Sequence, residues 1–208
     1  MRIPIASAGY VFILPPAAAA GFTAWLGRPV WAFLLGAITL FLIQFFRDPE
    51  RSPEGGEETI VSPADGTVLS VGSASEAPPA AGRRITIFMS VFNCHVNRSP
   101  VTGKLTSYEY SPGRKMAAFA EKASLDNEQN RITVTGQRGA VTFKQIAGAL
   151  ARRIVFRPRP GETLARGQRI GMIRCGSRVD LFAPDGAEIL VKRGDKVKAG
   201  RTGLARWG

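Results

Sequence analysis

Three short polar segments contain the residue types that could carry chemistry in this chain. They are residues 62–66 (SPADG), 93–100 (NCHVNRSP) and 174–180 (RCGSRVD). Each has an ordinary explanation, since Pro-Ala-Asp-Gly and Gly-Ser both suit turns and a histidine often ends a strand. Together they supply an acid (Asp65), an imidazole (His95) and a hydroxyl (Ser177). These are the three parts of a nucleophile, its base and the group that orients the base.

The glycine before Ser177 points to one particular kind of nucleophilic attack. Because Gly176 lacks a Cβ, its carbonyl is open to approach and its backbone can adopt strained angles. A serine nucleophile that attacks its own chain needs this arrangement at the preceding residue. The pair Gly176-Ser177 is therefore a candidate site of self-cleavage.

Histidine and cysteine counts exclude several classes of site. The chain has 1 histidine, whereas histidine-rich metal sites and the HExxH zinc proteases need at least two imidazole ligands. Its 2 cysteines, Cys94 and Cys175, are too few for a disulfide framework and lack the CxxC spacing of zinc or dithiol sites. We therefore expect no metal centre.

Charge is distributed unevenly along the 208 residues. The chain has 28 Lys+Arg against 16 Asp+Glu, a formal net charge of +12, yet residues 1–46 contain only Arg2 and Arg28. The remaining residues hold all the acidic side chains and most of the basic ones. We therefore expect an apolar end, residues 1–46, and a basic body, residues 47–208, in different environments.

The apolar end divides into two uncharged segments, Ile3 to Gly27 and Pro29 to Phe46. The second would rise about 27 Å as a helix, close to the roughly 30 Å hydrocarbon thickness of a bilayer. Pro15-Pro16 should kink or break the first segment near its middle, because two backbone donors are missing. The pattern predicts a helical hairpin associated with a membrane. A buried core hairpin fits less well, since no face carries charge.

Basic residues around the two segments predict which side of the membrane holds the body. Arg2, Arg47 and Arg51 outnumber Arg28 in the turn, which favours a cytoplasmic body at the cell membrane. A cleaved signal peptide is the alternative, with small residues at 17–20 near a possible cleavage point. The hairpin is favoured because the n-region has a single basic residue and a second apolar segment follows.

Beyond residue 46 the sequence changes to short runs rich in Val, Ile, Thr and Phe between Gly, Pro and Asp, which predicts a mainly β (α+β) body. Residues 52–59 read as a polar linker, and a helix is expected at 115–125. The expected strands are residues 67–72, 84–92, 103–110, 131–135, 140–145, 153–156, 168–173, 179–182 and 188–191.

Two Gly-containing passages, 166–171 and 193–200, resemble each other and the hammerhead turns of biotinyl and lipoyl carrier domains. No lysine stands at the tip where such domains carry a cofactor, so the likeness concerns shape alone. We read them as hairpin turns in a β-sandwich or barrel-like body.

The arrangement of these segments resembles the phosphatidylserine decarboxylase proenzymes, especially their short form. The order and spacing of the motifs, which cover nearly the whole chain, make the resemblance specific. Longer members carry a second histidine where this chain has Arg98, so no role of that imidazole transfers. The matching segments are residues 45–49 (FFRDP), 62–68 (SPADGTV), 88–98 (FMSVFNCHVNR), 127–130 (NEQN) and 176–180 (GSRVD).

The resemblance implies an enzyme that makes its own cofactor. Ser177 would attack the Gly176 carbonyl to form an ester, and β-elimination would then split the chain and leave a pyruvoyl group derived from Ser177. His95 is the implied base and Asp65 the acid that orients it. The large chain, residues 1–176, and the small chain, residues 177–208, would stay together as a heterodimer, with a higher oligomer possible.

The implied reaction is decarboxylation of phosphatidylserine to phosphatidylethanolamine and carbon dioxide. The pyruvoyl carbonyl would form a Schiff base with the substrate amine and accept the released electrons, so neither a metal nor pyridoxal phosphate is expected. His95 is also the candidate for protonating the product carbanion.

A lipid substrate accounts for the apolar end, because it keeps the body at an anionic membrane, where each basic residue contributes about 1 kcal/mol. Candidates for contact with the lipid phosphate or carboxylate are Arg98, Arg114, Lys115 and Arg178.

Three other functions compete with this interpretation. A membrane-anchored serine hydrolase or peptidase of the Ser-Lys kind would also combine apolar segments with a β-rich body, but its chain would stay intact. A non-enzymatic, membrane-tethered carrier-like adaptor would contain no carbonyl group. A nucleic-acid binder, suggested by the sequence pI of about 10.6, is disfavoured because its basic segments lack interleaved aromatics.

Overall fold

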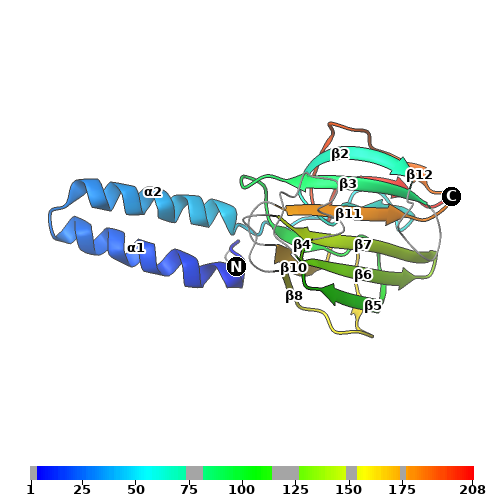
Figure 1. Cartoon of the computed structure of the whole chain (residues 1–208), viewed down its shortest axis with the longest axis horizontal. Coiled ribbons are helices and arrows are strands. Elements are labelled where there is room, and N and C mark those ends of the chain that lie inside the picture. Colours follow the sequence, from blue (N-terminus) through cyan, green and yellow to red (C-terminus); the bar gives the residue numbers. More distant parts are fainter. Residues whose placement is uncertain (1–3, 74–81, 114–126, 149–153, 174–176) are drawn as a thin grey trace. The chain divides into compact units, whose positions relative to one another are not determined.

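A computed structural model of the chain describes residues 4–73, 82–113, 127–148, 154–173 and 177–208 (Figure 1). The chain divides into two compact units, Met1–Glu50 and Arg51–Gly208, and each is described by itself. The expected helix at 115–125 lies outside the described residues.

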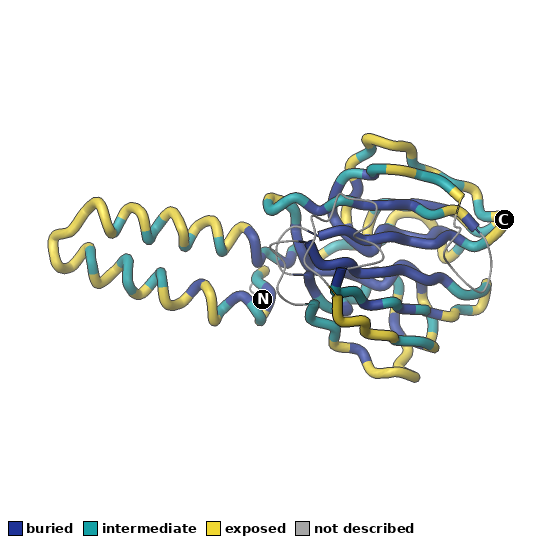
Figure 2. Tube along the Cα trace, in the orientation of Figure 1, coloured by how far each residue is buried: buried dark blue, intermediate teal, exposed yellow. Residues whose placement is uncertain are grey.

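The N-terminal unit is a pair of helices. A short 3-10 helix, η1 (Ser7–Gly9), leads into α1 (Tyr10–Trp25), and α2 (Pro29–Phe45) packs beside it. The connecting turn uses Gly27 at φ 68°, and a proline begins α2, where a missing N–H costs nothing. Most of the hairpin surface is exposed although its side chains are apolar (Figure 2). Trp25 and Phe33, for example, are 79% and 75% exposed. The expected helical hairpin is confirmed.

The two prolines of α1 do not break it, so the expected break is wrong. The helix runs without interruption from Tyr10 to Trp25 with Pro15 and Pro16 inside. The backbone N–H groups that the two prolines lack would have donated to the carbonyls of residues 11 and 12, in the first turn of the helix. The φ angle to which a proline ring is fixed is also compatible with a helix. The longer segment is also the one that could cross a bilayer: among the described residues, Ser7–Trp25 is long and apolar enough, with mean hydropathy 1.2. Pro29–Phe45, at 17 residues, is a shorter apolar helix.

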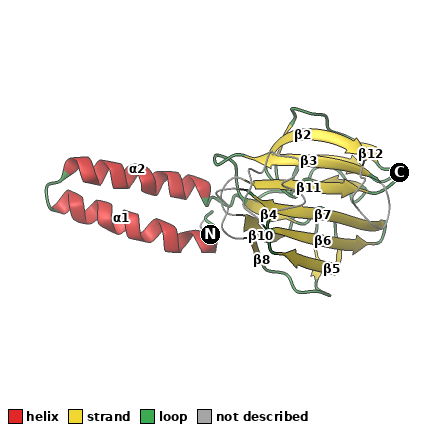
Figure 3. Ribbon diagram, viewed as in Figure 1, coloured by secondary structure: helices red, strands yellow, loops and turns green. Residues whose placement is uncertain are grey.

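The C-terminal unit is built from antiparallel strands (Figure 3). An eight-stranded sheet has the order β13-β2-β3-β11-β7-β6-β5-β9, and two three-stranded sheets have the orders β1-β14-β12 and β4-β10-β8. The strands are β1 (Thr59–Val61), β2 (Gly66–Ser73), β3 (Arg83–Met89), β4 (Val96–Arg98), β5 (Gly103–Ser111), β6 (Gln129–Gly136), β7 (Gly139–Ala147), β8 (Ile154–Phe156), β9 (Thr163–Leu164), β10 (Arg169–Ile173), β11 (Ser177–Ala183), β12 (Glu188–Ile189), β13 (Lys196–Val197) and β14 (Gly203–Arg206).

One hydrophobic core lies on the inner face of the large sheet. Alternate residues of its central strands point into this core, as the two-residue period of a strand requires. β11 lies between β3 and β7, and all seven of its residues are buried. The fully buried large side chains include Ile85, Ile87, Ile132, Phe143 and Leu181. The mainly β body is confirmed.

The two similar Gly-containing passages are not hairpin turns, so that interpretation is wrong. The turn at Gly167, with φ 79°, lies between β9 and β10, which belong to different sheets. The turn at Gly194, with φ 96°, likewise carries the chain from β12 in one sheet to β13 in another. A hairpin turn joins neighbouring strands of one sheet, whereas each of these turns connects strands of two different sheets.

Candidate functional site

Ser177 begins the central buried strand of the large sheet. It is the first residue of β11 and pairs with Met89 of β3 on one side and Ala147 of β7 on the other. The side chain is fully buried, and its Oγ lies 3.5 Å from Met89 Sδ. A thioether is a weak hydrogen-bond acceptor, so this contact restrains the hydroxyl little. Gly176 lies outside the described residues.

His95 lies directly before β4 and is also fully buried. Its Nδ1 is 2.9 Å from the carbonyl oxygen of Asn93. Because a carbonyl oxygen only accepts, Nδ1 of the neutral imidazole carries the proton, and Nε2 keeps its lone pair. The Asn93 side chain accepts hydrogen bonds from the Ser90 N–H and hydroxyl at 2.8 and 2.9 Å. The local turn therefore holds the imidazole in the tautomer of a general base.

Backbone pairing brings the His95 segment to the chain just before Ser177. The Ile173 N–H donates to the His95 carbonyl at 3.4 Å, and β10 ends at Ile173, four residues before Ser177. Four residues span at most about 14 Å, so Ser177 and His95 belong to one region of the fold. Met89 Sδ also lies 3.9 Å from Asn97 Nδ2, two residues after His95.

Asp65 is buried in the turn before β2, and its carboxylate is held by two partners. Arg51 Nη1 and Nη2 donate to Oδ1 and Oδ2, the second at 2.9 Å, and the Ala199 N–H donates to Oδ1 at 2.8 Å. The preceding Pro63 carbonyl accepts from the Arg98 N–H at 3.0 Å. The turn that carries Asp65 is thus bound to β4. The contact of His95 Nδ1 described above is to the carbonyl oxygen of Asn93.

Comparison with known proteins decides the family. The family model described as phosphatidylserine decarboxylase matches residues 38–205. The chain belongs to this family. The phosphatidylserine decarboxylase proenzyme of Solibacter usitatus is 46% identical over 203 residues, which cover 97% of this chain and 96% of that protein. The proenzyme of Geotalea uraniireducens is 45% identical, over 96% of this chain and 94% of that protein. The proenzyme of Magnetococcus marinus is 41% identical, over 97% of this chain and 94% of that protein.

Residues 127–130, one of the segments on which the sequence resemblance rests, also lie at this end of the sheet. The Asn127 side chain is buried and donates to the Ala147 carbonyl at 2.7 Å. Ala147 is the β7 residue that pairs with Ser177. The motif therefore holds the strand next to the candidate cleavage site.

The four basic residues considered for lipid contact have different surroundings in this phosphatidylserine decarboxylase family member. Arg98 is buried and donates from Nη1 to the Gly167 carbonyl at 3.0 Å. Arg178 is buried and donates from Nε and Nη2 to the two Asp180 oxygens at 2.6 and 2.7 Å. Both guanidinium groups thus make contacts within the body. Arg114 and Lys115 lie outside the described residues.

The fold brings several further polar residues to the site. In the sequence, Arg51 stands out only as a charge beside the apolar segments, and the motifs predict no site role for Gln145 or Asn130. Gln145 shares the inward face of β7 with Val141 and Phe143, and Asn130 shares that of β6 with Ile132. In the sequence, such a residue can be recognised as a polar side chain at a strand position where the alternating pattern otherwise places apolar side chains.

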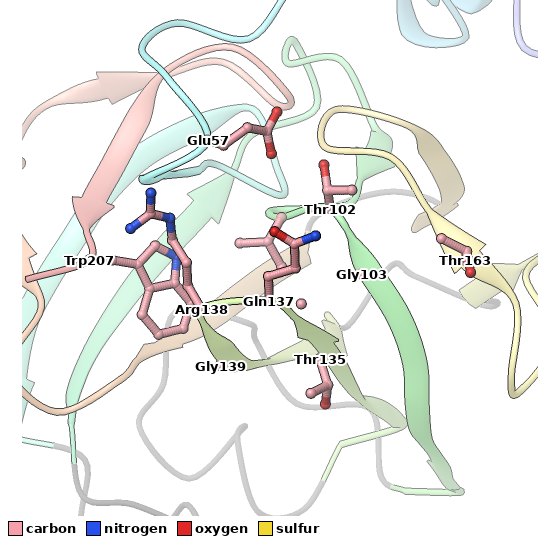
Figure 4. Close-up of a pocket in the computed structure, with 11 residues that line it drawn as sticks. Glu57, Thr102, Gly103, Thr135, Gln137, Arg138, Gly139, Thr163 and Trp207 are labelled. Atoms are coloured by element: carbon pink, nitrogen blue, oxygen red, sulfur yellow. The ribbon is translucent and has the colours of Figure 1, made fainter.

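The described residues contain no group of three or more His, Cys, Asp or Glu that could hold a metal. They do contain a cavity of about 620 Å³ beside the β6–β7 hairpin, where Arg138, Trp207 and Glu57 are among the lining residues (Figure 4). The turn of this hairpin leads into Gly139, the first residue of β7, whereas Ser177 pairs with Ala147 at the opposite end of β7. The cavity therefore does not belong to the candidate cleavage site.

Proposed function

We propose that this chain is a phosphatidylserine decarboxylase proenzyme that cleaves itself between Gly176 and Ser177 and converts phosphatidylserine to phosphatidylethanolamine. Family membership supports the reaction. The observation that supports the site best is the bond from the Ile173 N–H to the His95 carbonyl, because it places the backbone of the single histidine beside the end of β10, four residues before Ser177.

Self-cleavage would begin at the Ser177 hydroxyl. His95 Nε2 takes the hydroxyl proton while Oγ attacks the Gly176 carbonyl, so the peptide bond is exchanged for an ester. Loss of a proton from the Ser177 α-carbon then expels the Gly176 carboxylate and leaves a dehydroalanine. Water converts it to a pyruvoyl group with release of ammonia. Attack within the chain is favoured because the two groups are adjacent and already ordered.

The surroundings of Ser177 suit a pyruvoyl group. Ser177 is fully buried between β3 and β7, so the group would be protected from bulk water at the start of a rigid strand. The pyruvoyl group, once formed, supplies the electron sink for decarboxylation. His95, in the same region, is proposed to return a proton to the product carbon.

Strand pairing accounts for a heterodimer that survives cleavage. The small chain, residues 177–208, would keep β11 paired with β3 and β7, β13 with β2, and β14 with β1. All three strands join the large chain through backbone hydrogen bonds and a shared core. We therefore expect the two chains to separate only on unfolding.

Asp65 is proposed as the acid that stabilises the imidazolium formed when His95 accepts a proton. Its turn is bound to β4 through Pro63, and β4 directly follows His95. Arg51 and the Ala199 N–H fix the orientation of the carboxylate. A buried charge that is already oriented stabilises a developing opposite charge without reorganisation.

A membrane position for the enzyme is proposed from the hairpin and the charge. The apolar helices of the N-terminal unit would hold the chain at the cytoplasmic face of the cell membrane, and the net charge of +12 would favour anionic lipid. Arg114 and Lys115 are the proposed contacts to the lipid phosphate or carboxylate.

The proposed function is tested by carbon dioxide release from phosphatidylserine vesicles. The full chain is expected to release carbon dioxide, and Ser177→Ala is expected to release none. Thr133→Val is the control. The Thr133 hydroxyl on β6 lies 2.9 Å from the Thr142 hydroxyl on β7, and this contact is away from Ser177. Release by Ser177→Ala at the wild-type rate would reject the proposal. Labelling of intact wild-type chain by an acylating serine reagent would favour the hydrolase alternative.

A further inference from the structure

A line of side-chain hydrogen bonds crosses the core face of the large sheet at the end where Ser177 lies. The Tyr108 hydroxyl donates to Asn130 Oδ1 at 3.3 Å, and Asn130 Nδ2 donates to Gln145 Oε1 at 3.2 Å. Gln145 Nε2 then donates to Asn97 Oδ1 at 2.8 Å, and Asn97 Nδ2 donates to the Pro63 carbonyl at 3.2 Å. Asn97, Gln145 and Asn130 are at most 1% exposed, so water does not replace these bonds.

Every amide in this line has one possible orientation. The Pro63 carbonyl can only accept, so the Asn97 NH₂ must face it and Asn97 Oδ1 must face Gln145. The Gln145 NH₂ then faces Asn97, which leaves its oxygen for Asn130. Tyr108 completes the line as a donor, and burial raises the pKa of its hydroxyl, which keeps the proton in place. Donors that all run in one direction strengthen one another.

The last amide of the line lies beside the candidate cleavage site. Asn97 Nδ2 is 3.9 Å from Met89 Sδ, and Ser177 Oγ is 3.5 Å from the same sulfur atom. The other contact of this nitrogen is Pro63, two residues before Asp65. Asn97 also lies two residues after His95 in the chain. One amide is therefore adjacent to the segments that carry all three residues assigned to self-cleavage.

We propose that Asn97 is a positioning residue for self-cleavage, held by the hydrogen-bond line from Tyr108 so that its N–H groups face Pro63 and Met89. This inference rests on the proposed function. A reversed amide would place Asn97 Oδ1 against the Pro63 carbonyl, and two buried acceptors repel each other. The turn carrying Asp65 and the sulfur beside Ser177 would then shift, although every residue of the triad is still present.

The substitution Gln145→Glu tests the orientation, because the two side chains have the same shape. An ionised Glu can only accept, so Asn97 turns its NH₂ toward residue 145 and its oxygen toward Pro63. A protonated Glu can again donate to Asn97 and accept from Asn130. We therefore expect Gln145→Glu to cleave at least about tenfold more slowly than wild type at pH 8, which corresponds to about 1.4 kcal/mol in the barrier. The ratio of the two rates should approach one as the pH falls toward about 5.5.

The measurement uses full-length chain made in a short pulse of cell-free synthesis and moved at once into buffers from pH 5.5 to 8.5. The fraction of chain converted to residues 1–176 is followed on denaturing gels. Asn97→Ala should cleave slowly at every pH, because it has no amide to reorient. Thr133→Val, on the same strands but outside the line, should cleave at the wild-type rate. Thermal unfolding of each variant reports on its folding.

Two results would overturn the inference. One is cleavage of Gln145→Glu at the wild-type rate throughout the pH range. The other is a rate for Gln145→Glu that is reduced by the same factor at every pH, as a packing defect alone would produce. Failure of the wild-type chain to cleave at any pH would instead reject the proposed function on which the inference rests.

Discussion

Ser177 Oγ lies 3.5 Å from Met89 Sδ, and the two residues are directly paired on β11 and β3. The nucleophile of the proposed reaction is thus buried against a weak acceptor in the centre of the sheet, where little energy is lost when the hydroxyl turns toward another group. The same sulfur atom contacts Asn97, which links this strand to the segment that follows His95.

The ion pair between Arg51 and Asp65 should contribute strongly to stability. The two side chains are 10% and 8% exposed, so Arg51→Met leaves a buried carboxylate without its countercharge. We expect the free energy of unfolding to fall by about 3 kcal/mol, as measured by urea denaturation. Arg201→Met is the matched control, since its partner Glu54 lies 2.8 Å away and both side chains are about half exposed. That variant should lose at most about 1 kcal/mol. Equal losses in the two variants would contradict the prediction.

The turn before His95 should govern the rate of self-cleavage. Asn93→Ala removes the side chain that accepts from both the Ser90 N–H and the Ser90 hydroxyl, so the carbonyl that holds His95 Nδ1 becomes less fixed. We expect cleavage to slow about tenfold, as followed on denaturing gels. Ser90→Ala, which removes only one of the two bonds, should have a smaller effect. A rate for Asn93→Ala at or above that of Ser90→Ala would argue against this role of the turn.

The long strands and the helical hairpin were predictable from sequence because the side chains of each element share one kind of environment, which leaves a clear pattern in the sequence. β3 and β7 combine β-branched and aromatic residues with burial, and the helices carry an uninterrupted apolar sequence. Five strands of two to four residues in the described part of the chain were missed: β1, β4, β9, β13 and β14. A pair such as Lys196 with Thr67 depends on a partner far away in the sequence, and two residues carry too little pattern to reveal it.

The candidate triad was predictable by residue type, whereas its surroundings were not. Asp65, His95 and Ser177 stand out as chemistry-bearing residues in short polar segments. The pairing of Arg51 with Asp65 and the bond from Gln145 to Asn97 depend on how distant segments are folded together. Those contacts determine which donor and acceptor atoms of each side chain face the site.

Tyr108 should make stability depend on pH in the alkaline range. Burial, with a smaller contribution from nearby Tyr110, raises the pKa of Tyr108 above its usual value of about 10. A raised pKa means that the folded state holds the proton more tightly. The contribution of this group to stability is therefore complete below about pH 10 and is lost as the pH rises through the folded-state pKa. The difference in unfolding free energy between wild type and Tyr108→Phe should be constant up to about pH 9.5 and fall above it. A constant difference up to pH 11.5 would contradict this.

The helical hairpin should determine membrane binding without affecting self-cleavage. Phe33 and Leu40 are 75% and 68% exposed on α2, so the double substitution Phe33→Asp and Leu40→Asp places two charges in the apolar surface. We expect most of the chain to leave the pellet when it is sedimented with anionic vesicles, because a charge at the centre of a bilayer helix costs about 3 kcal/mol. Leu190→Asp, on an exposed site of the body, should remain bound. Full binding of the double variant would reject this role.

Self-cleavage at Gly176-Ser177 can be read directly from the intact mass of purified, denatured protein. We expect two chains, residues 1–176 and a small chain beginning at residue 177 with a pyruvoyl group that blocks stepwise N-terminal sequencing. Ser177→Ala should give a single chain of 208 residues. A wild-type preparation that contains only this full-length chain, with the mass of the unmodified sequence, would show that the chain does not cleave itself.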